Sequence, residues 1–129
     1  MGASTRKNYG TGRPMEARIG FSRAVRIGDR IHVAGTGPIW PDGSFDEDPG
    51  AQARRCLEII VEALAELGAS ASDVVRTRIY LTDAAYIDAV GPVHGEFFGA
   101  AGPASTAVVI AALLNPRWKV EIEADAIVD

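Results

Sequence analysis

The sequence predicts a domain of the α+β class, in which two helices cover one face of a single β-sheet and the elements follow the order ββαβαββ. Three observations predict this class. Residues 119–128 alternate between polar and apolar side chains, residues 48–68 have the spacing of an amphipathic helix, and the other extended segments are bounded by turn residues. The 129 residues are 47% hydrophobic, which suffices for one domain with a hydrophobic core.

The N-terminal segment is predicted to be a tail or a loosely attached arm. Residues 1–20 are rich in glycine, arginine and polar groups, and they carry turn-forming residues instead of a regular apolar pattern. We therefore assign an arm to residues 1–18 and a single domain to residues 19–129.

A tight hairpin is expected to begin the domain. Its strands are residues 21–27 and 30–34, and the two-residue connection Gly28-Asp29 is of a type that favours a short hairpin turn. The following stretch, 35–49, contains three prolines and three glycines and is predicted to be a loop.

Two helices are expected. The first begins at Asp48-Pro49, where a carboxylate at the cap and a proline at the first helical position are both start signals, and it ends at Gly68. The second covers residues 84–98 and contains Gly91-Pro92, which predicts a kink or a division into two shorter segments.

The two last strands, 105–110 and 119–128, are expected to form a terminal hairpin around Asn115-Pro116. One face of the last strand is apolar, and the other carries a lysine and three acids: Lys119, Glu121, Glu123 and Asp125. Like charges in a row need cations, water or a second function. The middle strand, 74–82, places two arginines on one face, where they can oppose these acids: Arg76 and Arg78. Such a sheet face is either exposed to water or buried against another subunit.

Composition argues against several classes of protein. The formal net charge of −4 provides no basic surplus for nucleic acid, and no apolar run approaches the about 18–20 residues of a membrane span. The single cysteine, Cys56, allows no intrachain disulfide and fits a reducing, cytoplasmic setting. Because Cys56 lies on the apolar face of its helix, we expect it in the core.

No motif in the sequence predicts a metal or a cofactor. His94-Gly95-Glu96 matches the His-x-Glu of zinc deaminases, but that site also needs two further cysteines. We expect structural roles for His94 and His32. Gly35-Thr36-Gly37 lacks dinucleotide-binding spacing and is predicted to be a turn, whose backbone N–H groups can hold a carboxylate. Ser105 has no nucleophile elbow, which argues against a serine hydrolase.

Seven segments of the chain resemble the RidA/YjgF family, also called the endoribonuclease L-PSP family. They occur in family order over residues 19–128 and are Ile19-Gly20, Ala34-Gly35, 51–57, 75–83, 96–98, 103–108 and 119–124. The resemblance implies a chorismate-mutase-like fold and a homotrimer with three clefts at its subunit interfaces. It also implies that small metabolites are bound without any cofactor.

The resemblance also implies a set of site residues. Glu121 matches the family glutamate that helps to position water, and Gly35 matches a backbone position near the substrate carboxylate. In deaminating members an arginine that binds this carboxylate follows Pro-Ala, and its place is Ser105 here, so the chain falls in a subgroup without that arginine. A family tyrosine falls at Ser22. Arg23 is the expected substitute cation, since a hydroxyl cannot supply the paired bonds of a guanidinium; its alternative reading is a surface arginine.

Two readings of function follow from these residues. The first is a cofactor-free hydrolase or deaminase of an imine, an enamine or a related metabolite, with altered specificity and with Glu121 orienting or deprotonating water. The second is a metabolite-binding or interaction protein that keeps the trimeric scaffold without the chemistry. A ribonuclease or translation inhibitor is a poorer third, because the chain lacks a basic patch, a catalytic histidine pair and an aromatic platform.

Overall fold

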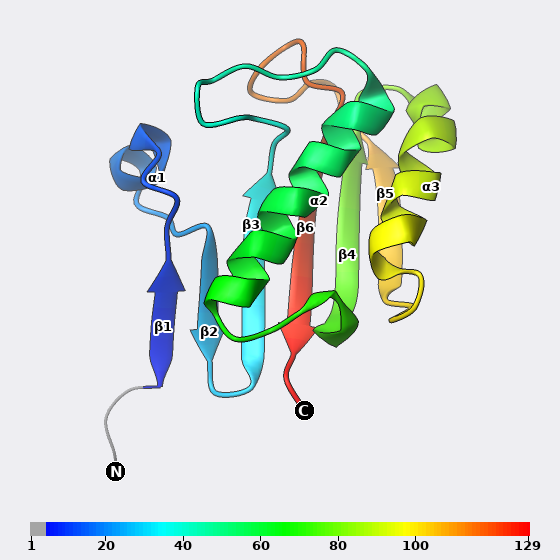
Figure 1. Ribbon diagram of the computed structural model, residues 1–129. Coiled ribbons are helices and arrows are strands. Elements are labelled where there is room, and N and C mark those ends of the chain that lie inside the picture. Colours follow the sequence, from blue (N-terminus) through cyan, green and yellow to red (C-terminus); the bar gives the residue numbers. More distant parts are fainter. Residues whose placement is uncertain (1–4) are drawn as a thin grey trace.

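One six-stranded sheet with helices α2 (Pro49–Glu66) and α3 (Ile87–Phe98) on one face makes up the computed structural model, which describes residues 5–129 (Figure 1). The strand order is β1-β2-β3-β6-β4-β5. Neighbouring strands are antiparallel except β4 and β5, which are parallel. The strands are β1 Arg6–Tyr9, β2 Ala24–Ile27, β3 Arg30–Thr36, β4 Val74–Leu81, β5 Ala104–Val109 and β6 Val120–Ile127. The predicted fold class and its two-helix cover are confirmed.

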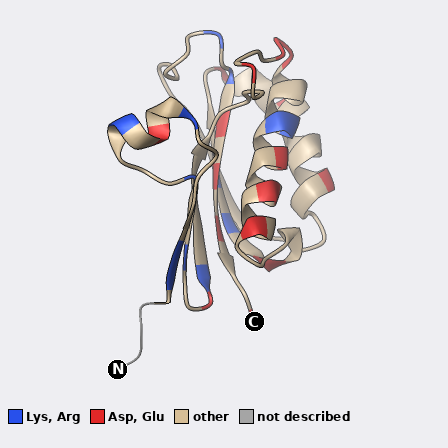
Figure 2. Ribbon diagram, turned by 60° about the vertical axis from the view of Figure 1, so that its left-hand side comes forward, with Lys and Arg blue, Asp and Glu red and all other residues tan. Residues whose placement is uncertain are grey.

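The first predicted hairpin and the first predicted helix are confirmed. Ile27 pairs with Arg30 across a two-residue turn in which Gly28 has a φ of 59°. Asp48 caps α2, because its side chain accepts a hydrogen bond of 2.9 Å from the backbone N–H of Ala51. Acidic residues follow the outer side of α2 (Figure 2), while its apolar side is buried against the sheet. Cys56 is fully buried in this core, as expected.

The predicted terminal hairpin is wrong. β5 and β6 lie on opposite edges of β4, and residues 110–119 lead the chain from one to the other. β4 and β5 are parallel and are joined through α3. β5 pairs only with β4 and is an edge strand, whereas β6 pairs with β3 on one side and with β4 on the other. Turn residues at Asn115-Pro116 mark a reversal of the chain, but they do not say which strands pair.

The prediction of a loosely attached N-terminal arm is also wrong for residues 5–18, the part of the arm that the structure describes. β1 pairs with β2 as an added edge strand, and helix α1 (Pro14–Ile19) follows it. β1 is exposed and polar in sequence, so no alternation marks it as a strand. Pro14, one of the turn-forming residues of this segment, is the first residue of α1. Residues 1–4 of the predicted arm lie outside the described residues.

The second predicted helix differs in where it is interrupted. α3 continues through Pro92, and the change of helix type comes earlier, where a 3₁₀ turn at Ala84–Tyr86 leads into Ile87. A further 3₁₀ turn, Ala71–Asp73, precedes β4. Within residues 5–129, no helix combines the length and the apolar character needed to cross a membrane.

Gln52 of α2 connects two loops at one end of the sheet. Its side chain is fully buried, and its Nε2 donates to the carbonyls of Asp46 (2.8 Å) and Arg117 (3.2 Å). The backbone N–H of Lys119 donates to Gln52 Oε1 (2.7 Å). These bonds hold the loop before α2 and the segment before β6 in fixed positions next to the end of β3.

Candidate functional site

A cavity of about 1060 Å³ lies beside the end of β3. It is bordered by α1, by the loops before α1 and after β3, and by residues of α2 and of the segment before β6. Three of the five predicted site residues line it: Arg23, Gly35 and Glu121. Gly35 belongs to β3, Glu121 belongs to β6 and Arg23 directly precedes β2, and the meeting of Gly35 with Glu121 depends on the pairing of β6 with β3.

Glu121 rests directly on the backbone of Gly35. A Cβ atom at Gly35 would lie 2.7 Å from Glu121 Oε2, which is closer than Cβ atoms approach other heavy atoms. The carboxylate can therefore occupy this position only while residue 35 is glycine. The register of β3 against β6 shifts between Val33 and Thr36, which places Gly35 at an irregularity of the ladder. The close fit explains why a glycine stands at this position.

The ionisation of Glu121 is set by burial. Its half-buried position raises the pKa of the carboxyl above its usual value; the charge of Arg23 lowers it, and the charge of Glu123 adds to the increase. The effect of burial on the pKa of Glu121 is larger than the opposing effect of Arg23. Within residues 5–129, Glu121 makes no hydrogen bond or ion pair. Its carboxylate is therefore available to accept a proton, as a general base must.

Arg23 is buried and held from two sides. Its side chain is 10% exposed, its Nη1 donates to the carbonyl of Gly35 (2.7 Å) and to Thr36 Oγ1 (3.0 Å), and its Nε lies 3.5 Å from Glu16 Oε2. Among the described residues, its Nη2 has no hydrogen-bond partner. Nη2 carries N–H groups, which can donate hydrogen bonds to a ligand in the cavity. Because its side chain is buried and held in place, Arg23 is not a surface arginine.

Glu16 is a site residue that the sequence analysis missed. It is 6% exposed and accepts hydrogen bonds from the backbone N–H (2.9 Å) and the hydroxyl (2.6 Å) of Thr11. It thereby fastens the loop before α1 and positions Arg23 at the same time. No sequence motif marks Glu16, since it lies in the segment predicted to be a loose arm.

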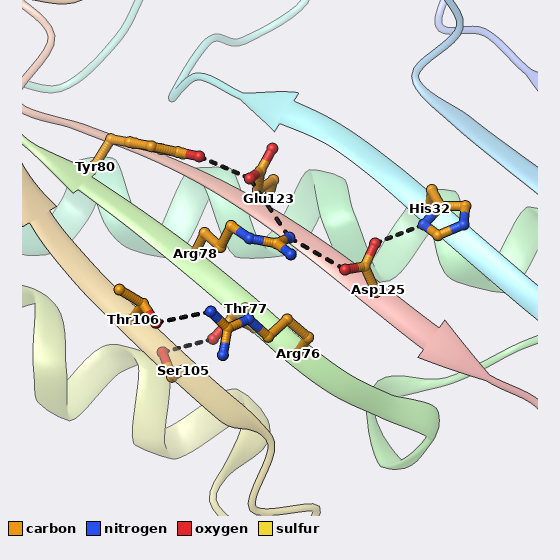
Figure 3. A network of polar contacts seen from close by, with 9 residues as sticks. All are labelled: His32, Arg76, Thr77, Arg78, Tyr80, Ser105, Thr106, Glu123 and Asp125. Atoms are coloured by element: carbon orange, nitrogen blue, oxygen red, sulfur yellow. Dashed lines mark hydrogen bonds and ion pairs between the residues drawn. The ribbon is translucent and has the colours of Figure 1, made fainter.

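The other two acids of β6 have polar partners on the helix-free face of the sheet (Figure 3). Tyr80 donates to Glu123 (2.7 Å), and Arg78 Nη1 lies 3.1 Å from Asp125 Oδ2 and 3.6 Å from Glu123 Oε1. His32 Nδ1 lies 2.7 Å from Asp125 Oδ1. The predicted pairing with acids therefore holds for Arg78, whereas Arg76, of the same strand, donates to a hydroxyl at 2.8 Å, that of Thr106. Of the three acids, Glu121 alone faces the large cavity.

Ser22 does not line the cavity with Glu121. It borders a second hollow of about 470 Å³ on the same sheet face, which also contacts His32, Glu123 and Asp125. Ser22 accepts a hydrogen bond of 2.9 Å from Asn8 Nδ2. Within residues 5–129, no cluster of three or more His, Cys, Asp or Glu side chains has the geometry to hold a metal ion.

Ser105 lies even further from Glu121 in one subunit. It is on β5, separated from β6 by β4, and its Oγ accepts a hydrogen bond of 2.8 Å from Thr77 Oγ1. Thr77 Oγ1 also lies 2.8 Å from Nε2 of His94, whose pKa is lowered by burial. Among residues 5–129 of one chain, Ser105 does not line the cavity that contains Glu121.

Comparison with known proteins gives consistent matches over nearly the whole chain. Residues 11–128 match the family described as Endoribonuclease L-PSP. An uncharacterized protein of Streptomyces coelicolor is 38% identical over 117 residues, which is 90% of this chain and 87% of that protein. The 2-iminobutanoate/2-iminopropanoate deaminase of Salmonella typhimurium is 32% identical over 116 residues, 86% of this chain and 90% of that protein. A crystal structure of a YjgF/YER057c/UK114 family member from Mycobacterium tuberculosis has a TM-score of 0.88 at 46% identity and covers 95% of this chain and 99% of that one.

Proposed function

The chain belongs to the RidA/YjgF family, whose fold is chorismate-mutase-like, and we propose that it is a cofactor-free hydrolase of a small imine or enamine acting in the cavity at Glu121. One observation carries the proposal: a half-buried carboxylate without an ion pair shares the cavity with the open edge of a fixed guanidinium. A relative of this chain is named for the deamination of 2-imino acids, which have a carboxylate and a C=N bond on adjacent carbons.

The proposed reaction needs one base and one anchor. The carboxylate of the substrate accepts hydrogen bonds from Arg23 Nη2, which places the neighbouring imine carbon near Glu121. Glu121 takes a proton from a water molecule as its oxygen attacks the imine carbon, and the C=N bond becomes a C–N single bond. The proton passes from Glu121 to nitrogen, which gives an intermediate with a hydroxyl and an amino group on the same carbon. The hydroxyl proton then passes to nitrogen by way of the Glu121 carboxylate as the C–N bond breaks and the C=O bond forms, so that ammonia and a 2-oxo acid leave. The raised pKa of Glu121 makes its carboxylate a stronger base than that of an exposed glutamate.

We further propose that the active assembly is a homotrimer. β5 is exposed along its length, and Val108 (42% exposed) and Val109 (55%) present an unpaired, β-branched edge that favours association. Ser105 lies on this strand, apart from Glu121 of its own subunit. In a trimer with clefts at the interfaces, Ser105 and the cavity of a neighbouring copy meet.

The proposal is tested by producing imino acids in place with an amino-acid oxidase and measuring how fast the 2-oxo acid appears. We expect the protein to accelerate this step and Glu121→Gln to abolish the acceleration. The matched control is Glu123→Gln, a change of the same chemistry two residues along the same strand, where the carboxylate is held by Tyr80 and Arg78. Equal activity of Glu121→Gln and the natural chain would refute the assignment. Binding of a 2-oxo acid without any acceleration would favour the alternative, a metabolite-binding protein.

A further inference from the structure

Apolar side chains gather at the cavity although water reaches them. Leu114 (78% exposed), Ile19 (62%) and Met15 (38%) all line it. They come from the segment before β6 and from α1, which are far apart in sequence. Large apolar groups left this exposed around one opening are typical of a binding surface.

The apolar lining is continuous with the polar groups of the site. The ring of Phe21 lies 5.3 Å from the guanidinium carbon of Arg23. The ring of Trp118 packs so closely on the backbone of Gly37 that a Cβ there would be 2.6 Å from it, and Gly37 is two residues from Gly35. Phe21, Trp118 and Ile39 all line the cavity. A ligand whose carboxylate is bound at Arg23 therefore has aromatic and aliphatic surface within its reach.

The volume of the cavity exceeds what a three-carbon imino acid occupies. Cavities of about 300–1,000 Å³ commonly hold ligands with several times as many atoms, and this one has about 1060 Å³. We infer that the substrate is an imino acid with a branched aliphatic or aromatic side chain, which packs on the apolar lining at Leu114, Ile19 and Phe21 while its carboxylate is bound by Arg23. This inference rests on the proposed function for the position of the imine carbon beside Glu121.

The experiment compares two product acids that differ only in the side chain, pyruvate and 4-methyl-2-oxopentanoate. Binding is followed by tryptophan fluorescence, since Trp118 lines the cavity, and is checked by calorimetry. The branched acid has three more carbons than pyruvate, and burial of each contributes about 0.8 kcal/mol of binding free energy. Since about 1.36 kcal/mol corresponds to a factor of ten in affinity, the preference for the branched acid is at most about 50-fold. We expect at least about 10-fold, because burial against an open wall is incomplete.

The variants are Leu114→Ser and Ile19→Ser, whose side chains are mostly exposed and therefore contribute little to folding. Each is expected to lower the preference several-fold, because binding of the branched acid weakens more than binding of pyruvate. The matched control is Ile87→Ser at the start of α3, which is 38% exposed and does not line the cavity. Its preference is expected to equal that of the natural chain.

Several results would overturn the inference. These are equal affinity for the two acids, no binding of either at millimolar concentration, or a preference that both cavity variants retain. A change in oligomer mass in the variants without a change in preference would also overturn it, because the apolar lining would then contact a second copy. A clear preference for the branched acid without accelerated hydrolysis of any imine would instead contradict the proposed function and leave the ligand class standing.

Discussion

The contact between Gly35 and Glu121 allows the position of the carboxylate to be changed without altering its chemistry. In Gly35→Ala, the new Cβ would lie 2.7 Å from Glu121 Oε2 and 3.3 Å from its Cδ. The atoms that clash belong to the end of a flexible side chain, so we expect Glu121 to move and the backbone to stay. The backbone at Gly35 is outside the positive-φ region, so alanine causes no strain of its own there.

The expected loss is catalytic. Restoring ordinary contact shifts the carboxylate by roughly 1 Å, and misplacement by about 1 Å can cost about 100-fold in rate. We therefore expect kcat/KM for imine hydrolysis to fall between about 10- and 100-fold, while the free energy of unfolding changes by less than about 1 kcal/mol. The assay is release of the 2-oxo acid, with chemical denaturation on the same samples.

Gly37→Ala is the matched control, because the same substitution two residues away meets a different partner. Its Cβ would lie 2.6 Å from the ring of Trp118, which cannot turn aside as a carboxylate does. Overpacking of this kind costs about 1–3 kcal/mol of stability. Full activity of Gly35→Ala would refute the role of Glu121 geometry, and a loss of stability as large as that of Gly37→Ala would show that the contact is structural.

Three further predictions concern pH, assembly and substrate. The pKa of Glu121 is higher in the folded chain than its usual value of 4.5, so ionisation of this group lowers the stability of the fold as the pH rises from about 4.5 through the raised pKa. Glu121→Gln should therefore raise Tm at neutral pH and lose that advantage below about pH 4.5. Thermal unfolding at a series of pH values measures this difference. Light scattering should give the mass of a homotrimer, and a monomer across micromolar concentrations would contradict that assembly. With Ser105 in place of a carboxylate-binding arginine, we expect little or no hydrolysis of 2-aminoacrylate supplied by a serine dehydratase, and acceleration equal to that of an arginine-containing relative would show this reading of Ser105 to be wrong.

Some parts of the site were predictable because their signals are local. The alternation of β6 places Glu121, Glu123 and Asp125 on one face, and that face is free of helices in the structure. Arg23 was expected to replace the family arginine as a cation, and both Arg23 and Glu121 line one cavity. Their nearness alone did not determine the pKa of Glu121, because the degree of burial depends on α1 and the loops.

Other parts carried no local signal. Glu16 holds Arg23 through a segment whose composition indicates a loose arm, and its importance follows only from the pairing of β1 with β2. Ser105 begins the strand that precedes β6 in sequence, and the predicted terminal hairpin would have made these two strands neighbours. The parallel pairing of β4 with β5 separates the two residues instead.

By itself, the sequence determined the class of fold, the limits of α2, the first hairpin and the polar face of β6. Caps, turns and the two-residue period of a strand depend on neighbouring residues, and such preferences survive in any tertiary arrangement. Only the tertiary structure decided that β6 lies between β3 and β4, that Gly35 supports Glu121, and that Glu16 holds Arg23. Strand order depends on which long-range pairing buries the most apolar surface and satisfies the most backbone hydrogen bonds, and no window of neighbouring residues contains that balance.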